Sequence, residues 1–267
     1  ALPILRHLLS PPCLENNSCH GWYILLNKKN IVALCVASSM AFSMPVMADI
    51  VISGTRVIYK SDQKSVSVRL ENKGNSHLLV QSWLDTGDDN AEPGSINVPF
   101  TATPPVSRID AKRGQTIKLM YTGSTVLPSD KESVFWFNVL EVPPKPDASK
   151  VENQSLLQLA FRTRIKLFYR PAGLNGNPSE APLALKWKWA EGKSGLSVYN
   201  PTPYYVSFNN AELIAGGKSN PLNVKMVAPK SEEIFTISGS GGKATSGKVH
   251  FSAINDFGGA IEGDVNL

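Results

Sequence analysis

The sequence predicts an all-β protein of two domains. From Asp49 to the C-terminal end, short segments alternate between apolar and polar residues, the signature of strands that bury one face. Turn-forming clusters such as residues 72–76 and 87–94 separate these segments, and no segment keeps a helical period. A chain of 267 residues is long enough for two domains of ordinary size.

The first domain, residues 49–171, is expected to be an antiparallel sandwich. About seven strands fall within some 120 residues, with short loops between them, which is typical of the immunoglobulin type. The cysteine pair of many such domains is missing, so this prediction depends on the number and spacing of the strands. The expected strands are residues 50–52, 57–59, 65–71, 78–84, 116–121, 134–142 and the segment 156–171.

A second β domain, residues 172–267, is expected after Pro171. Proline does not continue a central strand, and a polar stretch, residues 173–181, follows it. A glycine-rich stretch, residues 238–242, is interpreted as a hairpin loop. The strands expected here are residues 183–189, 196–199, 204–213, 233–237 and 248–254.

The first 48 residues differ from the rest and are interpreted as an upstream extension with a signal peptide. Lys28 and Lys29 precede an apolar run, residues 31–42, and small residues end at Ala48. The mature chain is therefore expected to start at Asp49 and to be secreted, with residues 1–25 outside the natural protein. All three cysteines precede residue 49, so the mature chain is expected to form no disulfide.

Composition and motifs favour no catalytic function. From residue 49 onward, 24 basic and 21 acidic residues are spread along the chain, which argues against nucleic-acid binding. Two histidines, His77 and His250, and no metal-ligand spacing make a protein-built zinc site improbable. The stretch 238–245 departs from a phosphate-binding loop, and no nucleophile elbow occurs. We expect no enzyme activity, no metal and no cofactor.

One segment, residues 156–171, indicates a binding function. Leu157, Leu159 and Phe161 alternate with polar or small residues, and Arg162, Arg164 and Lys166 continue in the opposite register. A polar loop that contains prolines precedes the segment, so the strand is expected at a sheet edge, where unpaired backbone groups can pair with a foreign polypeptide. The alternative is an ordinary core strand of a sandwich.

Seven local patterns occur in order along the chain: GTRVIY (54–59), VQSW (80–83), TPPVSR (103–108), ESVFWFNV (132–139), RIKLFYRP (164–171), NPTPYY (200–205) and INDFG (254–258). Together they resemble the periplasmic pilus chaperones of the PapD and FimC type. The resemblance implies two immunoglobulin-like domains in an L or boomerang arrangement. It also implies a chaperone that folds and caps pilus subunits without ATP and delivers them to an outer-membrane usher in the periplasm of a Gram-negative bacterium.

The resemblance also implies roles for individual residues in subunit capture. Arg56 and Lys166 match the two cations that hold the C-terminal carboxylate of a bound subunit. Leu157, Leu159 and Phe161 match the donor strand that completes the subunit's fold. Because these odd positions and Lys166 differ in parity, a bulge or twist between Phe161 and Lys166 is expected if both are to face one partner.

Two further sets are implied by the resemblance. Glu132, Arg170 and Asp256 match an ion network across the domain junction. A face that docks on the usher is matched less closely, and core packing is an alternative for two of its members, Leu79 and Val106. This usher-facing set is Leu79, Gln81, Thr103, Pro105 and Val106.

The short loop before the donor strand and the absence of cysteine from the mature chain resemble the branch that serves rod-like pili. An exposed donor strand carries a risk of aggregation, so a self-capping homodimer is an expected further partner. The main alternative function is a secreted two-domain adhesin or binding module on the same fold. The joint presence of Arg56, Lys166 and the alternating strand favours the chaperone.

Overall fold

The computed structural model describes residues 49–145, 158–191, 195–238 and 246–267, and these ranges are all-β. Apart from the short 3-10 helix η2 (Ala181–Ala184), their regular elements are strands. The predicted fold class is confirmed. The expected leader, residues 1–48, lies outside the described residues.

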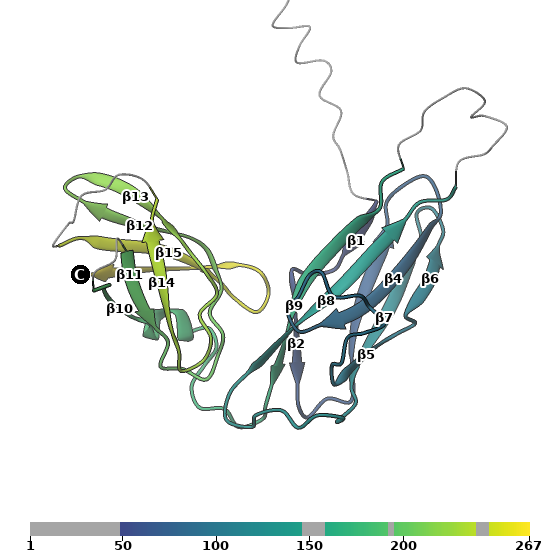
Figure 1. The fold of residues 1–267 in the computed structure, drawn as a ribbon, viewed down its shortest axis with the longest axis horizontal. Coiled ribbons are helices and arrows are strands. Elements are labelled where there is room, and N and C mark those ends of the chain that lie inside the picture. Colours follow the sequence, from purple (N-terminus) through teal and green to yellow (C-terminus); the bar gives the residue numbers. More distant parts are fainter. Residues whose placement is uncertain (1–48, 146–157, 192–194, 239–245) are drawn as a thin grey trace, which may run out of the picture. The chain divides into compact units, whose positions relative to one another are not determined.

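The first domain is a sandwich of two sheets (Figure 1). One sheet has four strands in the order β1-β3-β7-β5, and the other has five in the order β2-β9-β8-β4-β6. The strands are β1 (Ile50–Ile52), β2 (Arg56–Lys60), β3 (Val66–Asn72), β4 (Leu78–Asp85), β5 (Phe100–Thr103), β6 (Val106–Ile109), β7 (Gly114–Tyr121), β8 (Ser133–Val142) and β9 (Phe161–Arg170).

Aromatic side chains join the two sheets of this domain. Phe100 of β5 has its ring centroid 5.3 Å from that of Tyr59 on β2 and 4.9 Å from that of Phe135 on β8. The Tyr121 amide donates a hydrogen bond to the Tyr59 hydroxyl at 3.2 Å, so the one polar atom of this buried ring is satisfied. Strand alternation therefore places the apolar row of each sheet against the other.

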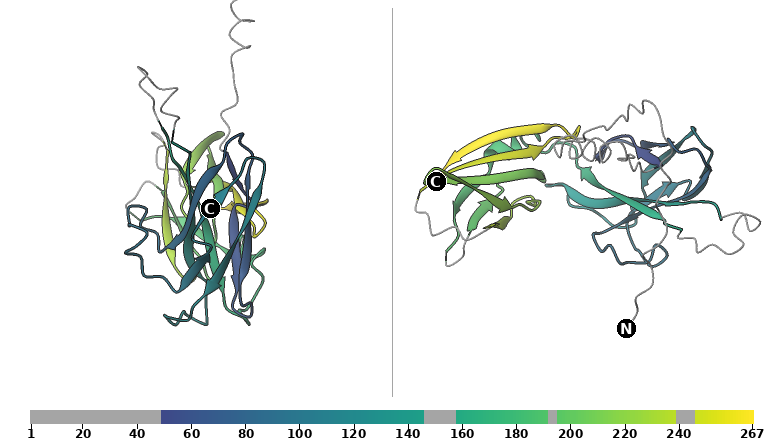
Figure 2. Two further views of the ribbon diagram at one scale, coloured as in Figure 1. Left: turned by 90° about the vertical axis from the view of Figure 1, so that its right-hand side faces the viewer. Right: turned by 90° about the horizontal axis from the view of Figure 1, so that it is seen from above.

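The second domain is built on one seven-stranded sheet in the order β10-β11-β14-β13-β12-β15-β16. Trp187 of β10 stacks on Phe251 of β15, with 5.6 Å between ring centroids, although four strands separate β10 from β15 in this order. The sheet must therefore curl around its own core. Figure 2 shows β15 and β16 side by side in yellow. The strands are β10 (Lys186–Trp189), β11 (Gly195–Tyr199), β12 (Phe208–Ala215), β13 (Lys218–Asn223), β14 (Glu232–Ile237), β15 (Lys248–Ile254) and β16 (Ala260–Asn266).

Several elements differ from the expected ones. Strands β5, β6, β13 and β16 are additional, because each is short or carries too few apolar residues to give a clear alternation. The expected strand 183–189 begins only at Lys186, after helix η2, whose first turn contains Pro182. The expected strand 204–213 begins at Phe208. Most of the predicted hairpin loop 238–242 lies outside the described residues.

Replacing Phe251 by alanine should lower the free energy of unfolding by about 3–5 kcal/mol, because it leaves a cavity beside Trp187 that a packed sandwich cannot close. Leu183→Ala is the control. Its side chain is exposed, so that variant should stay within about 0.5 kcal/mol of the wild type. Urea unfolding followed by circular dichroism measures both, and equal values for the two variants would contradict this account of the core.

Candidate functional site

Strand β9 is paired on both edges along only part of its length. Its whole length pairs antiparallel with β8, from Phe161 opposite Glu141 to Tyr169 opposite Ser133. The other edge pairs with β2, in parallel, only from Lys166 to Arg170. Within the described part of the chain, no strand pairs with that edge over residues 161–165. The predicted sheet edge therefore exists over the first half of β9, and its backbone groups are available to another chain.

The side chains on the inward-facing side of β9 lead from the buried core to exposed positions at the start of the strand. Leu167 is fully buried in the core and Ile165 packs against it. Toward the start of the strand, the same alternation carries Phe161 and Leu159, which are 51% and 53% exposed. Leu157, the third residue assigned to the donor strand, lies outside the described residues. Two large apolar side chains thus extend the core row into solvent at the free edge of the sheet.

Of the bulge or twist expected between Phe161 and Lys166, the bulge is absent, and the register does not test the twist. The register between β8 and β9 is regular throughout, so Phe161 and Lys166 point to opposite faces of the sheet. No bulge is needed, because a polypeptide paired along the edge of a strand has access to both faces of the sheet. The odd-numbered side chains would then face one side of such a polypeptide, and the even-numbered side chains would face the other.

Arg56 and Lys166 are brought together on that outer face. They are register partners at the first pair of the β2–β9 ladder, so their side chains leave neighbouring strands in the same direction. The Arg56 guanidinium donates through Nη1 to the carbonyl of Ile254 in the second domain at 3.1 Å. The two cations therefore lie where the outer face of the first domain meets the second.

The positive charges of Arg56 and Lys166 are partly buried and are only partly balanced by nearby acidic groups. Burial lowers the pKa of Lys166, and the charge of Arg56 lowers it further. Burial also lowers the pKa of Arg56, against the opposing charge of Asp256. Arg56 Nε is buried without a hydrogen-bond partner, and no hydrogen bond or ion pair of the Lys166 ammonium is found among the described residues. Two desolvated cations with free donors form a site that an anion, such as a carboxylate, would stabilise.

Glu132, Arg170 and Asp256 also come together, at the junction of the two domains. Arg170 binds both oxygens of Asp256, at 2.7 and 2.9 Å, and its Nε donates to Glu132 at 2.6 Å. The second oxygen of Glu132 accepts from the Tyr205 amide at 2.8 Å. Burial alone would lower the pKa of Arg170, but the hydrogen bonds that it donates to Asp256 and the charge of Glu132 outweigh burial and raise the pKa.

A second buried ion cluster was missed by the sequence reasoning. Asp85 is 1% exposed and accepts hydrogen bonds from Arg164, from Asn138 at 2.7 Å and from the Gly87 amide at 2.7 Å, while Arg162 lies at 3.4 Å. Burial alone would raise the pKa of Asp85, but the hydrogen bonds from Arg164 and Asn138 hold it below its usual value. Alternation in residues 83–85 and 162–166 was the available signal, since it places these side chains on one face.

Indole rings cover the same two arginines. The Arg162 guanidinium carbon lies 5.0 Å from the ring centroid of Trp83, and that of Arg164 lies 5.0 Å from the centroid of Trp136. Arg162 and Arg164 lie in the part of β9 that β2 does not cover, and the Asp85 carboxylate and the two indole rings hold them on the outer face. Their side chains do not cover the inner row, which leaves Leu159 and Phe161 exposed.

The residues assigned to the usher-facing set lie on or between β4, β5 and β6. Gln81 is the register partner of Val106, and the Ser82 amide donates to the Pro105 carbonyl at 2.7 Å. Leu79 and Val106 are 48% and 50% exposed, so the core-packing alternative for them was wrong. Thr103 is exposed as well. The set forms a partly apolar surface at the β6 edge of the five-stranded sheet.

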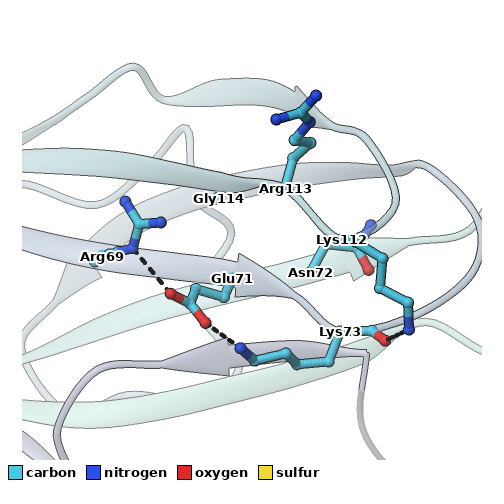
Figure 3. A pocket seen from close by; sticks show the side chains of 7 residues that line it. All are labelled: Arg69, Glu71, Asn72, Lys73, Lys112, Arg113 and Gly114. Carbon is cyan, nitrogen blue, oxygen red and sulfur yellow. Dashed lines mark hydrogen bonds and ion pairs between the residues drawn. The ribbon is translucent and has the colours of Figure 1, made fainter.

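A surface hollow of about 270 Å³ lies at the C-terminal end of β3, beside the start of β7 (Figure 3). It does not hold a pair of partly buried cations like Arg56 and Lys166. Three of its charged side chains form ion pairs, because Arg69 binds Glu71 at 3.0 Å and Lys73 binds the second oxygen of Glu71. The Lys112 ammonium binds the backbone carbonyl of Lys73. No metal-ligating cluster of three or more His, Cys, Asp or Glu occurs within the described ranges. None of the described helices is long and apolar enough to cross a membrane.

Comparison with known proteins gives the family of this chain. The family described as "Pili and flagellar-assembly chaperone, PapD N-terminal domain" matches residues 49–175, and "Pili assembly chaperone PapD, C-terminal domain" matches residues 180–265. The chain is 75% identical to the probable fimbrial chaperone YadV of Escherichia coli K12 over 246 residues, which covers 91% of this chain and 100% of YadV.

Solved structures agree with the sequence relatives. The crystal structure of the YadV chaperone, 71% identical, aligns with a TM-score of 0.73 over 82% of this chain and 100% of that one. The SafB chaperone of Salmonella enterica, solved in complex with the SafA pilin, matches at 27% identity and a TM-score of 0.69, over 84% of this chain and 99% of that one. The chain belongs to the PapD family of pilus-assembly chaperones.

Arg170→Ala should lower the free energy of unfolding by about 3–5 kcal/mol, because it leaves the Glu132 carboxylate buried at the junction without its cation. The control is Lys230→Ala, which removes an exposed ion pair with Asp130 and should leave stability close to that of the wild type. Thermal and urea unfolding of both variants measure this. An unchanged Arg170→Ala protein would contradict a structural role for the network.

Proposed function

We propose that this chain captures pilus subunits by adding the first half of β9 to the sheet of an incomplete subunit. The observation that carries the proposal is the coincidence of a free strand edge with an apolar row that runs out of the core, at Phe161 and Leu159. A subunit that lacks its last strand would gain backbone hydrogen bonds along the edge and apolar side chains for its groove. Each buried side chain would contribute on the order of 1.5–3 kcal/mol.

The subunit's C-terminal carboxylate is assigned to Arg56 and Lys166. These cations lie where the paired half of β9 begins, so a chain that runs along the free edge ends beside them. Arginine offers several donors in a fixed fork and lysine a point charge, and the free Arg56 Nε supports a further acceptor at this place. Leu157 is assigned to the same donor row as Leu159 and Phe161.

The remaining assignments follow from membership of the family and from the exposed surfaces. An outer-membrane usher is proposed to bind the surface around Leu79, Gln81, Thr103, Pro105 and Val106. A homodimer that pairs the two free β9 edges is proposed for the chain without a subunit. We place the protein in the periplasm of a Gram-negative bacterium, after cleavage between Ala48 and Asp49. The capture step uses binding energy alone and involves no catalysis, nucleotide or metal.

The experiment that tests the proposal is a partition assay. The chain is expressed in the periplasm with its signal peptide, a co-purifying subunit is identified by mass spectrometry, and the complex is purified. An equimolar amount of an epitope-tagged wild-type copy is then added in chelator and without ATP. The equilibrium share of subunit on each copy gives the ratio of affinities. If no small β-rich subunit co-purifies, or if transfer requires ATP, the proposal is wrong.

Arg56→Ala and Lys166→Ala should each move more than nine tenths of the subunit to the tagged wild-type copy, because each removes a ligand of a desolvated carboxylate. Lys118→Ala is the matched control, since Lys118 is an exposed lysine on a strand of the opposite sheet. That variant should share the subunit equally. Equal sharing by the Arg56 and Lys166 variants would contradict the assignment of the subunit's carboxylate to these two residues.

Leu159→Asp and Phe161→Asp should weaken capture at least tenfold while the melting temperature of the free chain changes little. Both side chains are about half exposed, so the free protein has little packing to lose, whereas a subunit groove would receive a charge. Ile165→Asp is the contrasting variant, because Ile165 packs on the core, and it should lower stability and capture together. If Leu159→Asp behaves like Ile165→Asp, the donor assignment fails.

Capture should weaken at alkaline pH earlier than an ordinary lysine would predict. Burial and Arg56 lower the pKa of Lys166, so Lys166 loses its proton below the usual lysine range in the free chain, and carboxylate binding must then restore that proton. In competition between the wild type and Lys166→Arg, the subunit should move toward the arginine variant as pH rises from about 7 to about 10. A pH-independent ratio would contradict the assigned role of Lys166.

A further inference from the structure

The turn between β15 and β16 is closed by hydrogen bonds that involve Asn255. Asn255 accepts hydrogen bonds on its Oδ1 from the amides of Phe257 and Gly259, each at 2.9 Å. Its own amide donates to the Gly259 carbonyl at 2.8 Å, and its carbonyl accepts from the Gly258 amide at 3.1 Å. Asn255 therefore takes part in the hydrogen bonds of three consecutive amides in the turn, those of Phe257, Gly258 and Gly259, as in Asx turns.

The same turn is attached to the first domain at alternate residues. Ile254 accepts from Arg56 at 3.1 Å, and Asp256 holds both Nη atoms of Arg170. Gly258 has a φ of +86°, and a Cβ built there would lie 2.6 Å from the Thr55 hydroxyl oxygen. Only glycine allows this close approach. Two sets of hydrogen bonds, to Ile254 and to Asp256, and the close approach of Gly258 to Thr55 place the turn against the first domain.

Phe257 lies between two of these attachment points, and its side chain is 95% exposed. An aromatic ring of this size forgoes the gain of burial when it is left in water, yet the amides of Phe257, Gly258 and Gly259 are hydrogen-bonded within the turn. Because the backbone is fixed and the ring has two rotatable bonds, ordering it against a partner costs little conformational entropy. These properties are those of an aromatic anchor at a binding interface.

We propose that Phe257 contacts an apolar side chain within the last few residues of the bound pilus subunit, just before the C-terminal carboxylate. The inference rests on the proposed function, and it names a further part of the same site. Arg56 links the two parts, because it is the register partner of Lys166 and also binds the carbonyl of Ile254 in the turn. A subunit chain that ends at Arg56 and Lys166 must pass close to this turn. Phe257 therefore adds selectivity for subunits whose C-terminal segment is apolar.

The partition assay with the purified subunit tests this contact. Phe257→Ala should shift the subunit roughly tenfold toward the tagged wild-type copy, with no change in the melting temperature of the free chain. Val126→Ala is the matched control, since Val126 is 91% exposed on a loop of the first domain, and it should share the subunit equally. A subunit whose apolar residue nearest the C-terminus is replaced by alanine should show no preference between Phe257→Ala and wild type.

Arg56→Ala separates this inference from the proposed function. If Arg56→Ala loses the subunit and Phe257→Ala shares it equally, the contact at Phe257 is wrong and the carboxylate anchor stands. If Arg56→Ala also shares the subunit equally, the proposed anchor itself fails. If Phe257→Ala instead changes only the monomer–dimer equilibrium in light scattering, or only the binding of a purified usher, the ring serves a second copy or the usher and the inference is overturned.

Discussion

The unequal pairing of β9 is the constraint on which the rest of the site depends. β2 covers one edge of the strand from Lys166 to Arg170 and leaves the same edge free from Phe161 to Ile165. A fully covered β9 would be a core strand with no binding role. A fully uncovered β9 would lack the fixed register that aligns Lys166 with Arg56. The short length of β2 therefore makes one continuous strand a structural element in one half and, in the function that we propose, a binding element in the other.

An unpaired strand with exposed apolar residues would normally favour aggregation, and the outer face of β9 limits this. Arg162 and Arg164 lie in the free half, and the Asp85 carboxylate and the rings of Trp83 and Trp136 hold them. The charged outer face thus stiffens the strand and keeps it soluble without covering Leu159 and Phe161. The same arrangement orders the strand before a partner arrives, which reduces the entropy that capture must overcome.

The sequence predicted the all-β class and most long strands, because alternation in segments such as 78–84 and 134–142 is strong. It also predicted that Arg162, Arg164 and Lys166 share a face. It could not predict that β2 ends its pairing at Lys166, since partner choice between strands is a tertiary property. The buried Asp85 was missed for the same reason, because its cations come from a strand 79 residues away. Parity alone led to the expectation of a bulge or a twist, and the bulge is absent. A partner at a strand edge can reach both faces of the sheet without one.

Membership of the PapD family fixes the class of protein, while the binding surface itself is read from pairing, burial and charge. Residue-resolved hydrogen exchange by NMR is the most direct measurement of the central claim, comparing the free chain with its purified subunit complex. The account predicts that amides of residues 158–165 that do not bond to β8 exchange rapidly in the free chain and become protected in the complex, while residues 166–170 are protected in both states. An intact complex in which these amides still exchange rapidly would contradict strand addition at β9.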